Sequence, residues 1–532
     1  MSARMEKVPW SSLLAWLILG ATATAPLWFT YFLTLDGPMH VLHTCALKAQ
    51  WFSGRYDTAQ VSYDASDRFD PSDLLLMPLT VLCSPEQAHA AYASLALLTL
   101  FAGIGLATRS LGRSSAWAMA WCAPLAWSYV LILGFLPFVF AVGWALVVVG
   151  WWNGLRRVEG RHAWSLLLGA AIAQWLHRSG GTVLLLGLCT TELMRWAGDR
   201  VTARERLASL PMGWRWAAVL AVLGALLYTG LVLARTPITE MPAPRDAMQG
   251  LLSLRAFLLL HAEAEAPHLL VLGGLLITAV SVSIVRRLRG MAPRGAADGL
   301  WVAALLLFAA SVLVDTPYAR LLFLPIRAQW LAWVLLGCWT IVSLPRTWWA
   351  HALVAGMVVA HGLRIVDVEQ RMAGSRITHE ELLAAVDHLK PHGVVMPFNR
   401  DDNWLHDHLG AYLAARYEGV LFSPHDHLRF RYAQPVATPV RLFGTGPQHG
   451  LRWLEAHVAG GGPPVIDHVV LIGHGDRPDE RYRNLERVLV RHFGLTWRNR
   501  YVEIWTRNGA GTTADHKDPG LNLAPPPRGR AE

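Results

Sequence analysis

Long apolar runs separated by short polar connections dominate the chain as far as Leu363. Most of these runs approach the ~20 residues that an α-helix needs to cross the hydrocarbon core of a bilayer. The pattern predicts a polytopic α-helical membrane protein with about eleven spans. The runs are Leu13 to Leu33, Ala88 to Ala107, Ala116 to Val130, Phe135 to Trp152, Ala163 to Leu176, Thr182 to Met194, Trp216 to Val232, Pro267 to Val285, Leu300 to Val314, Leu321 to Leu344 and Trp348 to Leu363. The fifth and sixth runs are short, and a re-entrant hairpin is the alternative for that pair.

Basic residues test this topology independently, because Lys and Arg are retained on the cytoplasmic side of a membrane. They occupy every second connection: Arg4 and Lys7, then Arg109 and Arg113, then Arg156, Arg157 and Arg161, then Arg195, Arg200, Arg204 and Arg206, then Arg286, Arg287, Arg289 and Arg294, and finally Arg346. The N-terminus is therefore predicted inside, and the segment after Leu363 outside. In a bacterium this topology predicts a protein of the inner (cytoplasmic) membrane whose C-terminal part lies in the periplasm or exterior.

After Leu363 the pattern changes to short strand-like runs that alternate with helical stretches. Strands are predicted over 393–398, 419–422, 468–473 and 501–505, and helices near 379–390, 404–417, 451–458 and 481–493. This alternation predicts an α/β domain with a largely parallel sheet. We therefore expect a transmembrane domain over 1–364, with long external loops at 36–86 and 235–266, and an extracytoplasmic α/β domain over 365–507. The tail over 508–532 is rich in Gly, Pro and charge, which predicts disorder.

Composition agrees with a membrane protein. Of the 532 residues, 53% are hydrophobic and 16% are charged, and the mean hydropathy is +0.32, which is too apolar for a soluble globule. The net charge of +9 does not indicate nucleic-acid binding, because the Arg residues fall in clusters between apolar runs. A cleaved signal peptide is an alternative for the first run, although its length favours a retained helix. Five cysteines form no CxxC pair, and only Cys45 and Cys83 are candidates for a disulfide.

The segment Asp36-Gly-Pro-Met-His40 follows the first run, where a membrane helix meets water. Ionisable groups at such a boundary are costly unless they have partners, so they are candidates for function. If the chain turns helical after Pro38, Asp36 and His40 lie on one face and could deprotonate a hydroxyl or hold a metal, with His43 as a weaker third ligand. The equal alternative is that Asp36 caps the N-terminus of a helix.

Two further groups of residues suit a ligand with hydroxyls and phosphate. Acids including Asp64 and Asp67 lie among aromatic residues in the first external loop, where they can accept hydroxyl protons while rings cover a sugar face. Arg320 and Arg327 are seven residues apart at the start of the tenth run, on one helical face. A guanidinium within an apolar run needs an anionic partner, and a lipid phosphate or an internal ion pair with Asp315 or a first-loop carboxylate would serve.

This layout resembles the GT-C superfamily of polyprenyl-phosphate-sugar-dependent glycosyltransferases. Asp36 to His40 looks like the Asp-x-Pro-x-His segment of bacterial membrane proteins distantly related to that superfamily. The resemblance implies that Asp36 is a catalytic base or a ligand of a divalent metal, Mg²⁺ or Mn²⁺, and that Arg320 or Arg327 holds the lipid phosphate. Many members have adjacent or alternate acids in the first loop, whereas here His40 stands in the fourth place after a single acid.

The function expected from this resemblance is transfer of a sugar from a polyprenyl-phosphate-type lipid donor to an extracytoplasmic acceptor in envelope glycan or glycolipid synthesis. The expected partners are membrane lipid, the lipid-linked donor and an acceptor that the sequence does not identify, with no nucleic acid. The alternatives are a transporter or flippase of a lipid-linked sugar and a non-catalytic envelope scaffold. Against a transporter, the sequence has no inverted repeat and no matched pair of broken helices.

Overall fold

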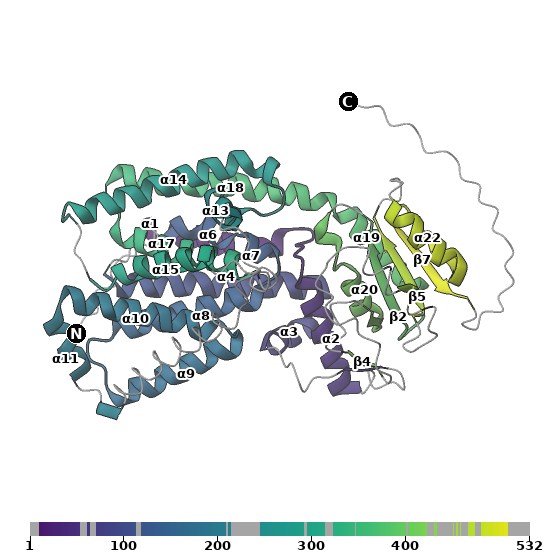
Figure 1. Cartoon of the computed structure of the whole chain (residues 1–532), viewed down its shortest axis with the longest axis horizontal. Helices are drawn as coiled ribbons and strands as arrows, with labels where there is room; N and C mark the ends of the chain where they lie inside the picture. Colours follow the sequence, from purple (N-terminus) through teal and green to yellow (C-terminus); the bar gives the residue numbers. More distant parts are fainter. Residues whose placement is uncertain are drawn as a thin grey trace.

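In the computed structural model, the chain forms a long bundle of helices with a smaller α/β domain at one end (Figure 1). Five helices of the described residues are long and apolar enough to cross a membrane: Pro85–Ser110, Leu136–Gly154, Glu263–Leu288, Leu324–Ser343 and one that begins at Trp348. The chain is therefore a multi-pass membrane protein. The structure describes residues 10–53, 61–63, 71–112, 119–208, 211–213, 245–291, 295–313, 323–345, 347–400, 403–422, 430–432, 451, 454–455, 458, 466–473 and 480–508.

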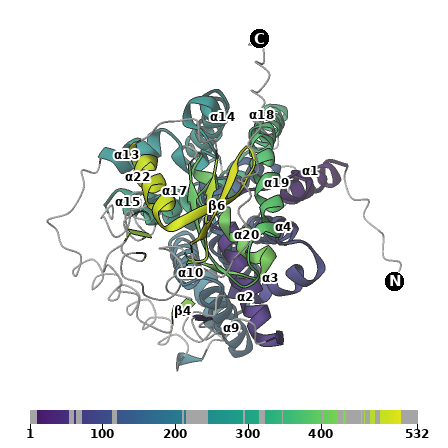
Figure 2. The same cartoon turned by 90° about the vertical axis from the view of Figure 1, so that its right-hand side faces the viewer.

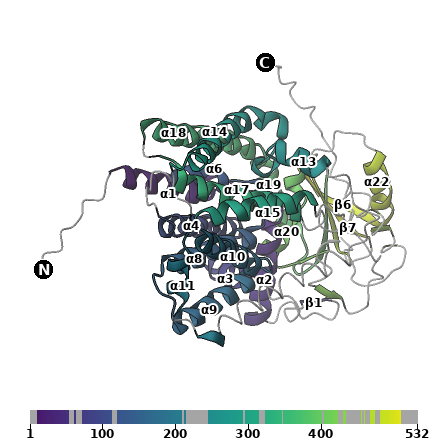
Figure 3. The same ribbon diagram turned by 60° about the vertical axis from the view of Figure 1, so that its left-hand side comes forward.

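Helices occupy every predicted run that the structure describes, except the third. They run along the long axis of the molecule (Figures 1 and 3). The predicted run Trp216 to Val232 lies outside the described residues, so the number of spans stays a prediction. The bundle helices are α1 (Trp10–Trp28), α4 (Pro85–Ser110), α8 (Leu136–Gly154), α9 (Gly160–Leu176), α10 (Gly180–Gly198), α14 (Ala262–Leu288), α15 (Asp298–Leu313), α17 (Leu324–Ser343) and α18 (Trp348–Gly374).

The third run, Ala116 to Val130, is not one continuous helix, and that part of the prediction is wrong. It forms three short pieces: η1 (Ala120–Cys122), α6 (Ala123–Ala126) and α7 (Tyr129–Ile132). Trp127 and Ser128 are extended, and the Ser128 hydroxyl accepts a hydrogen bond from the Leu131 amide, which starts α7 afresh. A serine that caps a new helix competes with continuation of the preceding one, which a hydropathy window does not detect.

This broken segment nevertheless crosses the bundle. Helices α4 and α8, which precede and follow it in the sequence, run in the same direction, so the chain between them has to return from one end of the bundle to the other. Gly143 packs against Leu100, and Gly150 packs against Ala107. Irregular backbone at membrane depth is tolerated only when protein covers it and its polar groups find partners. Both conditions are met: residues 119–132 are buried except for the half-buried Tyr129, and the indole of Trp330 donates to the Leu125 carbonyl at 2.8 Å.

The fifth and sixth runs form α9 and α10, and α10 lies beside α8 along most of its length. Gly180 packs against Ala141 near the start of α10, and Arg195 donates to Asn153 near its end at 2.6 Å. Helix α10 therefore reaches as deep as α8, while the choice between two spans and a re-entrant hairpin stays a prediction.

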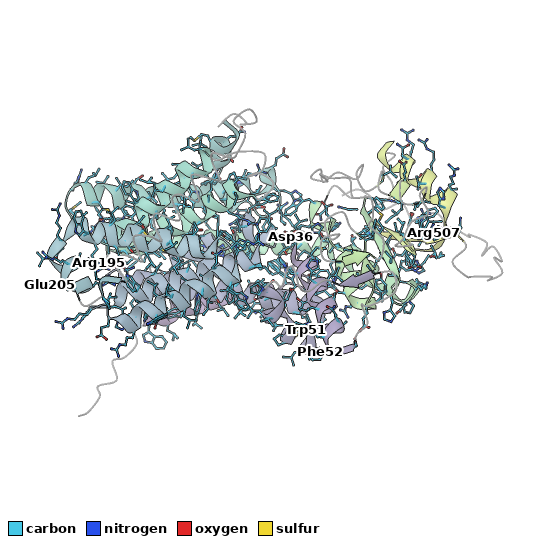
Figure 4. The ribbon with its side chains drawn as sticks, turned by 60° about the horizontal axis from the view of Figure 1, so that its bottom comes forward. Asp36, Trp51, Phe52, Arg195, Glu205 and Arg507 are labelled. Atoms are coloured by element: carbon cyan, nitrogen blue, oxygen red, sulfur yellow. The ribbon has the colours of Figure 1, made fainter. Side chains whose placement is uncertain are left out.

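Those basic connections that the structure describes lie at the end of the bundle opposite to the α/β domain, as alternating topology requires. Helix α11 (Arg200–Ala208) and the side chain of Arg195 lie at that end (Figures 1 and 4). Arg206 binds the Glu192 carboxylate there, and Arg287 lies 3.2 Å from Asp298. The side of the membrane that this end faces stays a prediction.

Apolar side chains also cover the outside of the bundle. On α14, Leu270 and Ile277 are 76% and 57% exposed, and on α9 Trp164 and Leu168 are 67% and 65% exposed. Large apolar side chains on a continuous outer surface are stable against lipid but costly against water.

The C-terminal domain is built on a five-stranded sheet of order β3-β2-β5-β7-β6. Helix α22 (Glu480–His492) covers the face that points away from the bundle, and α19 (Arg376–Ala384) and α20 (Gly410–Tyr417) lie between the sheet and the bundle (Figures 1 and 2). The strands are β2 (Val394–Asn399), β3 (Val420–Leu421), β5 (His468–Ile472), β6 (Phe493–Arg498) and β7 (Val502–Arg507).

The predicted strands are present, but the largely parallel sheet is not. β2 is parallel to β3 and β5, whereas β7 is antiparallel to both β5 and β6. Strand β6 was not predicted, because α22 ends at His492 and the strand begins at the next residue, Phe493. β6 and β7 are separated by three residues, and strands joined by so short a connection pair antiparallel.

The described parts of the segment predicted as the first external loop pack against the C-terminal domain. This segment contains α2 (Gly37–Ser53) and α3 (Pro71–Leu82), and Ala46, Leu47 and Met77 belong to the same buried apolar cluster as residues of the sheet. Its short strand β1 (Val61–Tyr63) pairs antiparallel with β4 (Phe430–Tyr432) (Figure 3). The loop and the domain are therefore parts of one packed unit.

A fully buried ion pair joins α18 to the start of α14. Arg364 Nε lies 3.6 Å from Glu265 Oε2, and both side chains are 0% exposed. Arg364 also donates to the carbonyls of Phe257 and Trp127, while Glu265 accepts from the amides of Leu259, Leu260 and His261. The boundary that we drew after residue 364 thus falls inside α18, at a core residue.

We predict that Arg364→Leu destabilises the protein by about 3–5 kcal/mol, because it leaves the Glu265 carboxylate buried without its cation. The measurement is unfolding of the purified protein in detergent. Arg371→Leu on the same helix is the matched control: its pair with Asp367 is partly exposed, and exposed pairs contribute about 0–1 kcal/mol. Equal losses in the two variants would contradict the prediction.

Candidate functional site

Asp36 lies in the connection between α1 and α2, at the junction of the bundle and the C-terminal domain (Figure 4). Its main-chain carbonyl accepts hydrogen bonds from the amides of Met39 and His40, so Asp36 immediately precedes α2. Capping of that helix by the Asp36 carboxylate stays a prediction. The backbone before Asp36 is held by the broken segment. Leu35 donates to the Ile132 carbonyl at 2.9 Å, and Asp36 donates to the Leu133 carbonyl at 3.1 Å.

Two glycines permit this close packing around Asp36, Gly134 against backbone and Gly37 against side chains. Gly134 has a φ of +81°, and a Cβ there would lie 2.8 Å from the amide nitrogens of both Asp36 and Gly37. A Cβ on Gly37 would lie 2.1 Å from Nε2 of His89 on α4. Contacts under 3 Å force something to move, so the position of Asp36 depends on both residues being glycine.

The Asp36 side chain is one third exposed and faces a histidine from the C-terminal domain. His408 Nδ1 lies 3.3 Å from Asp36 Oδ1, and the His408 side chain is 15% exposed. The carboxylate is thus accessible to a ligand and is contacted by a residue 372 positions later in the chain.

Arg327, in the first turn of α17, lies in the same region. Its guanidinium carbon is 3.9 Å from the ring centre of Phe135 and 5.5 Å from that of Phe138. The negative charge of Asp36 acts on this guanidinium. Among the described residues, Nε of Arg327 has no hydrogen-bond partner although it is buried. A buried donor of this kind is costly unless a further acceptor binds it.

Two more cationic or titratable groups lie on aromatic rings near this end of the bundle. The ring of His177 is 5.3 Å from that of Phe138, and Arg255 lies 5.9 Å from the ring of Tyr129. Arg327 and His177 therefore share Phe138. Arg327 and Arg255 thus add positive charge at the end of the bundle that bears the C-terminal domain.

His40 and His43 follow Asp36 on α2, where His40 is half-buried and His43 is buried. No three His, Cys, Asp or Glu side chains within the described ranges come together as metal ligands. The metal and the ligand role of His43 stay predictions from the sequence.

Several predicted site residues lie outside the described residues: Asp64, Asp67, Arg320 and Asp315. Their part in the site is therefore untested. In contrast, His408 was not selected from the sequence. No local pattern marks it, because its partner Asp36 is distant in the chain and only folding brings the two together.

No known protein family matches this sequence, and no curated protein matches it. One similar solved structure is the crystal structure of ArnT from Cupriavidus metallidurans bound to undecaprenyl phosphate. The two chains are 13% identical, the match covers 94% of this chain and 98% of that one, and the TM-score is 0.37. A score of that size does not establish a shared fold, so the function of this chain has to be inferred from its own residues.

Proposed function

We propose that this protein is a membrane glycosyltransferase that moves a sugar from a polyprenyl-phosphate-type lipid donor to an extracytoplasmic acceptor, in envelope glycan or glycolipid synthesis. The main support is the presence of an accessible carboxylate and a buried cation in one region: Asp36 is fixed by backbone contacts, and its charge contributes to the electrostatic environment of Arg327. Both lie where the membrane bundle meets the C-terminal domain, which is where this proposal places the lipid donor and the water-soluble acceptor.

The chemistry needs a base and a group that stabilises the leaving phosphate. An acceptor hydroxyl attacks the anomeric carbon of the sugar, and the bond from that carbon to the phosphate oxygen breaks. The hydroxyl proton passes to Asp36, and the polyprenyl phosphate leaves with the bonding electrons. A phosphate is a good leaving group, so positioning and proton removal supply most of the required acceleration.

Arg327 suits the phosphate because a guanidinium offers several donors in a fixed fork. Its stacking on Phe135 holds the planar head in one orientation and removes water from one side. In this proposal a phosphate oxygen accepts a hydrogen bond from Nε of Arg327, which has no other partner among the described residues. No step is assigned to a metal.

A transporter of a lipid-linked sugar is the second candidate, and the broken segment of residues 119–132 favours it. Discontinuous helices frame the substrate sites of many transporters. The discriminating residue is Asp36, since a transporter has no need of a base. A non-catalytic scaffold would need neither Asp36 nor the cation beside it.

We predict that Asp36→Asn lowers kcat on the order of 10²- to 10⁴-fold, the usual contribution of a general base, with folding unchanged. His40→Ala is expected to reduce transfer as well. The assay follows radiolabelled sugar from a panel of polyprenyl-phosphate sugars into membrane glycans. Asp367→Asn, an exposed acid paired with Arg371, is the control and is expected to keep full activity. Full transfer by Asp36→Asn would rule out its role as the base.

We predict that Arg327→Leu weakens binding of a polyprenyl phosphate about 10- to 100-fold, because a hydrogen bond to a charged group contributes about 1.5–3 kcal/mol. Binding is measured by calorimetry in detergent. Arg376→Leu removes an exposed arginine that pairs with Glu380 and is expected to leave the affinity as in wild type. If the two variants bind equally well, Arg327 does not hold the phosphate.

A further inference from the structure

One side of a helical segment in the C-terminal domain faces the bundle. The segment comprises η5 (Trp404–His406), a turn and α20, and His408, Tyr412 and Arg416 within it are four residues apart. Residues at this spacing lie one above another on a helix. Their contacts follow the same order: His408 to Asp36, Tyr412 to His89, and Arg416 to Glu86.

The middle contact continues to the backbone beside Asp36. Tyr412 Oη lies 2.8 Å from His89 Nδ1, and His89 Nε2 lies 3.1 Å from Thr34 Oγ1. The same threonine oxygen accepts the Gly37 amide at 3.1 Å. Tyr412 and His89 are both buried, and burial followed by the nearby charge of Glu86 raises the pKa of Tyr412 well above its ordinary value. The phenol therefore stays protonated and keeps its hydrogen-bonding proton.

The third contact is an ion pair that anchors the segment to the first turn of α4. Arg416 donates to both Glu86 oxygens, at 2.7 and 3.3 Å. His379 on α19 lies 3.7 Å from the same carboxylate, and its ring packs edge-on against Tyr412 at 5.3 Å. A forked arginine contact sets orientation as well as distance.

The other side of α20 is tied to the sheet. Gly410 packs against Pro397 of β2, and the Tyr417 hydroxyl donates to the Gly393 carbonyl at 2.9 Å. A displacement of the sheet relative to the bundle would therefore move His408 and Tyr412 with it, because one short helix carries both sets of contacts.

From these contacts we propose that His408 and Tyr412 are positioning residues for Asp36, so that the site is complete only when the C-terminal domain is docked on the bundle. His408 orients the carboxylate directly. Tyr412 acts through His89 and Thr34 on the backbone that carries it. This inference rests on the proposed role of Asp36 as a base. It adds two residues of the C-terminal domain, His408 and Tyr412, to those that position Asp36.

The test compares two tyrosines of one helix in the full-length protein. Tyr412→Phe removes the hydroxyl that meets His89, whereas the control Tyr417→Phe removes a buried hydroxyl that bonds within the domain. We expect Tyr412→Phe to speed hydrogen–deuterium exchange at the amides of Leu35 to Gly37 and to lower kcat on the order of 10-fold, since small misplacement of a catalytic group is costly. Tyr417→Phe should change neither quantity, and polyprenyl phosphate should bind both variants as it binds wild type.

A second comparison addresses His408. In His408→Asn the amide nitrogen can take the place of Nδ1, whereas His408→Leu keeps bulk but offers no polar atom. We expect the asparagine variant to keep most of the wild-type kcat and the leucine variant to lose on the order of 10-fold, with KM for the lipid donor unchanged. Equal kcat in the two variants would overturn the role of His408.

The outcomes separate this inference from the proposed function. If Asp36→Asn transfers sugar normally while Tyr412→Phe still loosens residues 35–37, the proposed function fails and the mechanical coupling stands without a catalytic purpose. If Asp36→Asn is inactive while Tyr412→Phe matches Tyr417→Phe in both exchange and kcat, the function stands and the positioning role of Tyr412 is overturned.

Discussion

The site depends on backbone carbonyls that the interrupted third run leaves free of helical partners. A helix that ends inside a membrane protein leaves carbonyls that require other donors. Here the carbonyls of Ile132 and Leu133, at the end of α7, accept the amides of Leu35 and Asp36, and that of Trp127 accepts from Arg364. The end of α7 therefore fixes the acid loop, and the break at Trp127 receives the buried cation of α18. A helix that continued through Trp127 would keep that carbonyl for its own hydrogen bonds.

Much of the architecture follows from the sequence because a bilayer imposes strong rules. Length and apolarity identify the runs that form helices. The alternating arginine clusters identify the connections that lie at the end of the bundle opposite to the C-terminal domain. Hydropathy averaged over a window of residues does not show where a run is interrupted, since the interruption at Ser128 depends on one side chain that caps α7. In the C-terminal domain, the short strand β6 was hidden because it begins immediately after α22.

The candidate site was predictable only in its local part. Asp36 and Arg327 stand out because charge beside or within an apolar run is unusual, and the charge of Asp36 does act on Arg327. His408, Tyr412 and His89 could not be chosen, since their significance comes from contacts across more than 300 residues of chain. The buried pair of Arg364 with Glu265 was missed for a different reason: the arginine stands at the edge of the last run, where a snorkelling side chain is the ordinary expectation.

The packing of α2 and α3 into the apolar core of the C-terminal domain has a consequence for biosynthesis. Ala46, Leu47 and Met77 emerge from the ribosome more than 300 residues before Val394 and Phe398, with which they share a buried cluster. The first loop must therefore wait, with apolar surface uncovered, until the last part of the chain arrives. A chaperone for unfolded segments would have its natural client in this interval, and the C-terminal domain expressed alone would lack part of its own core.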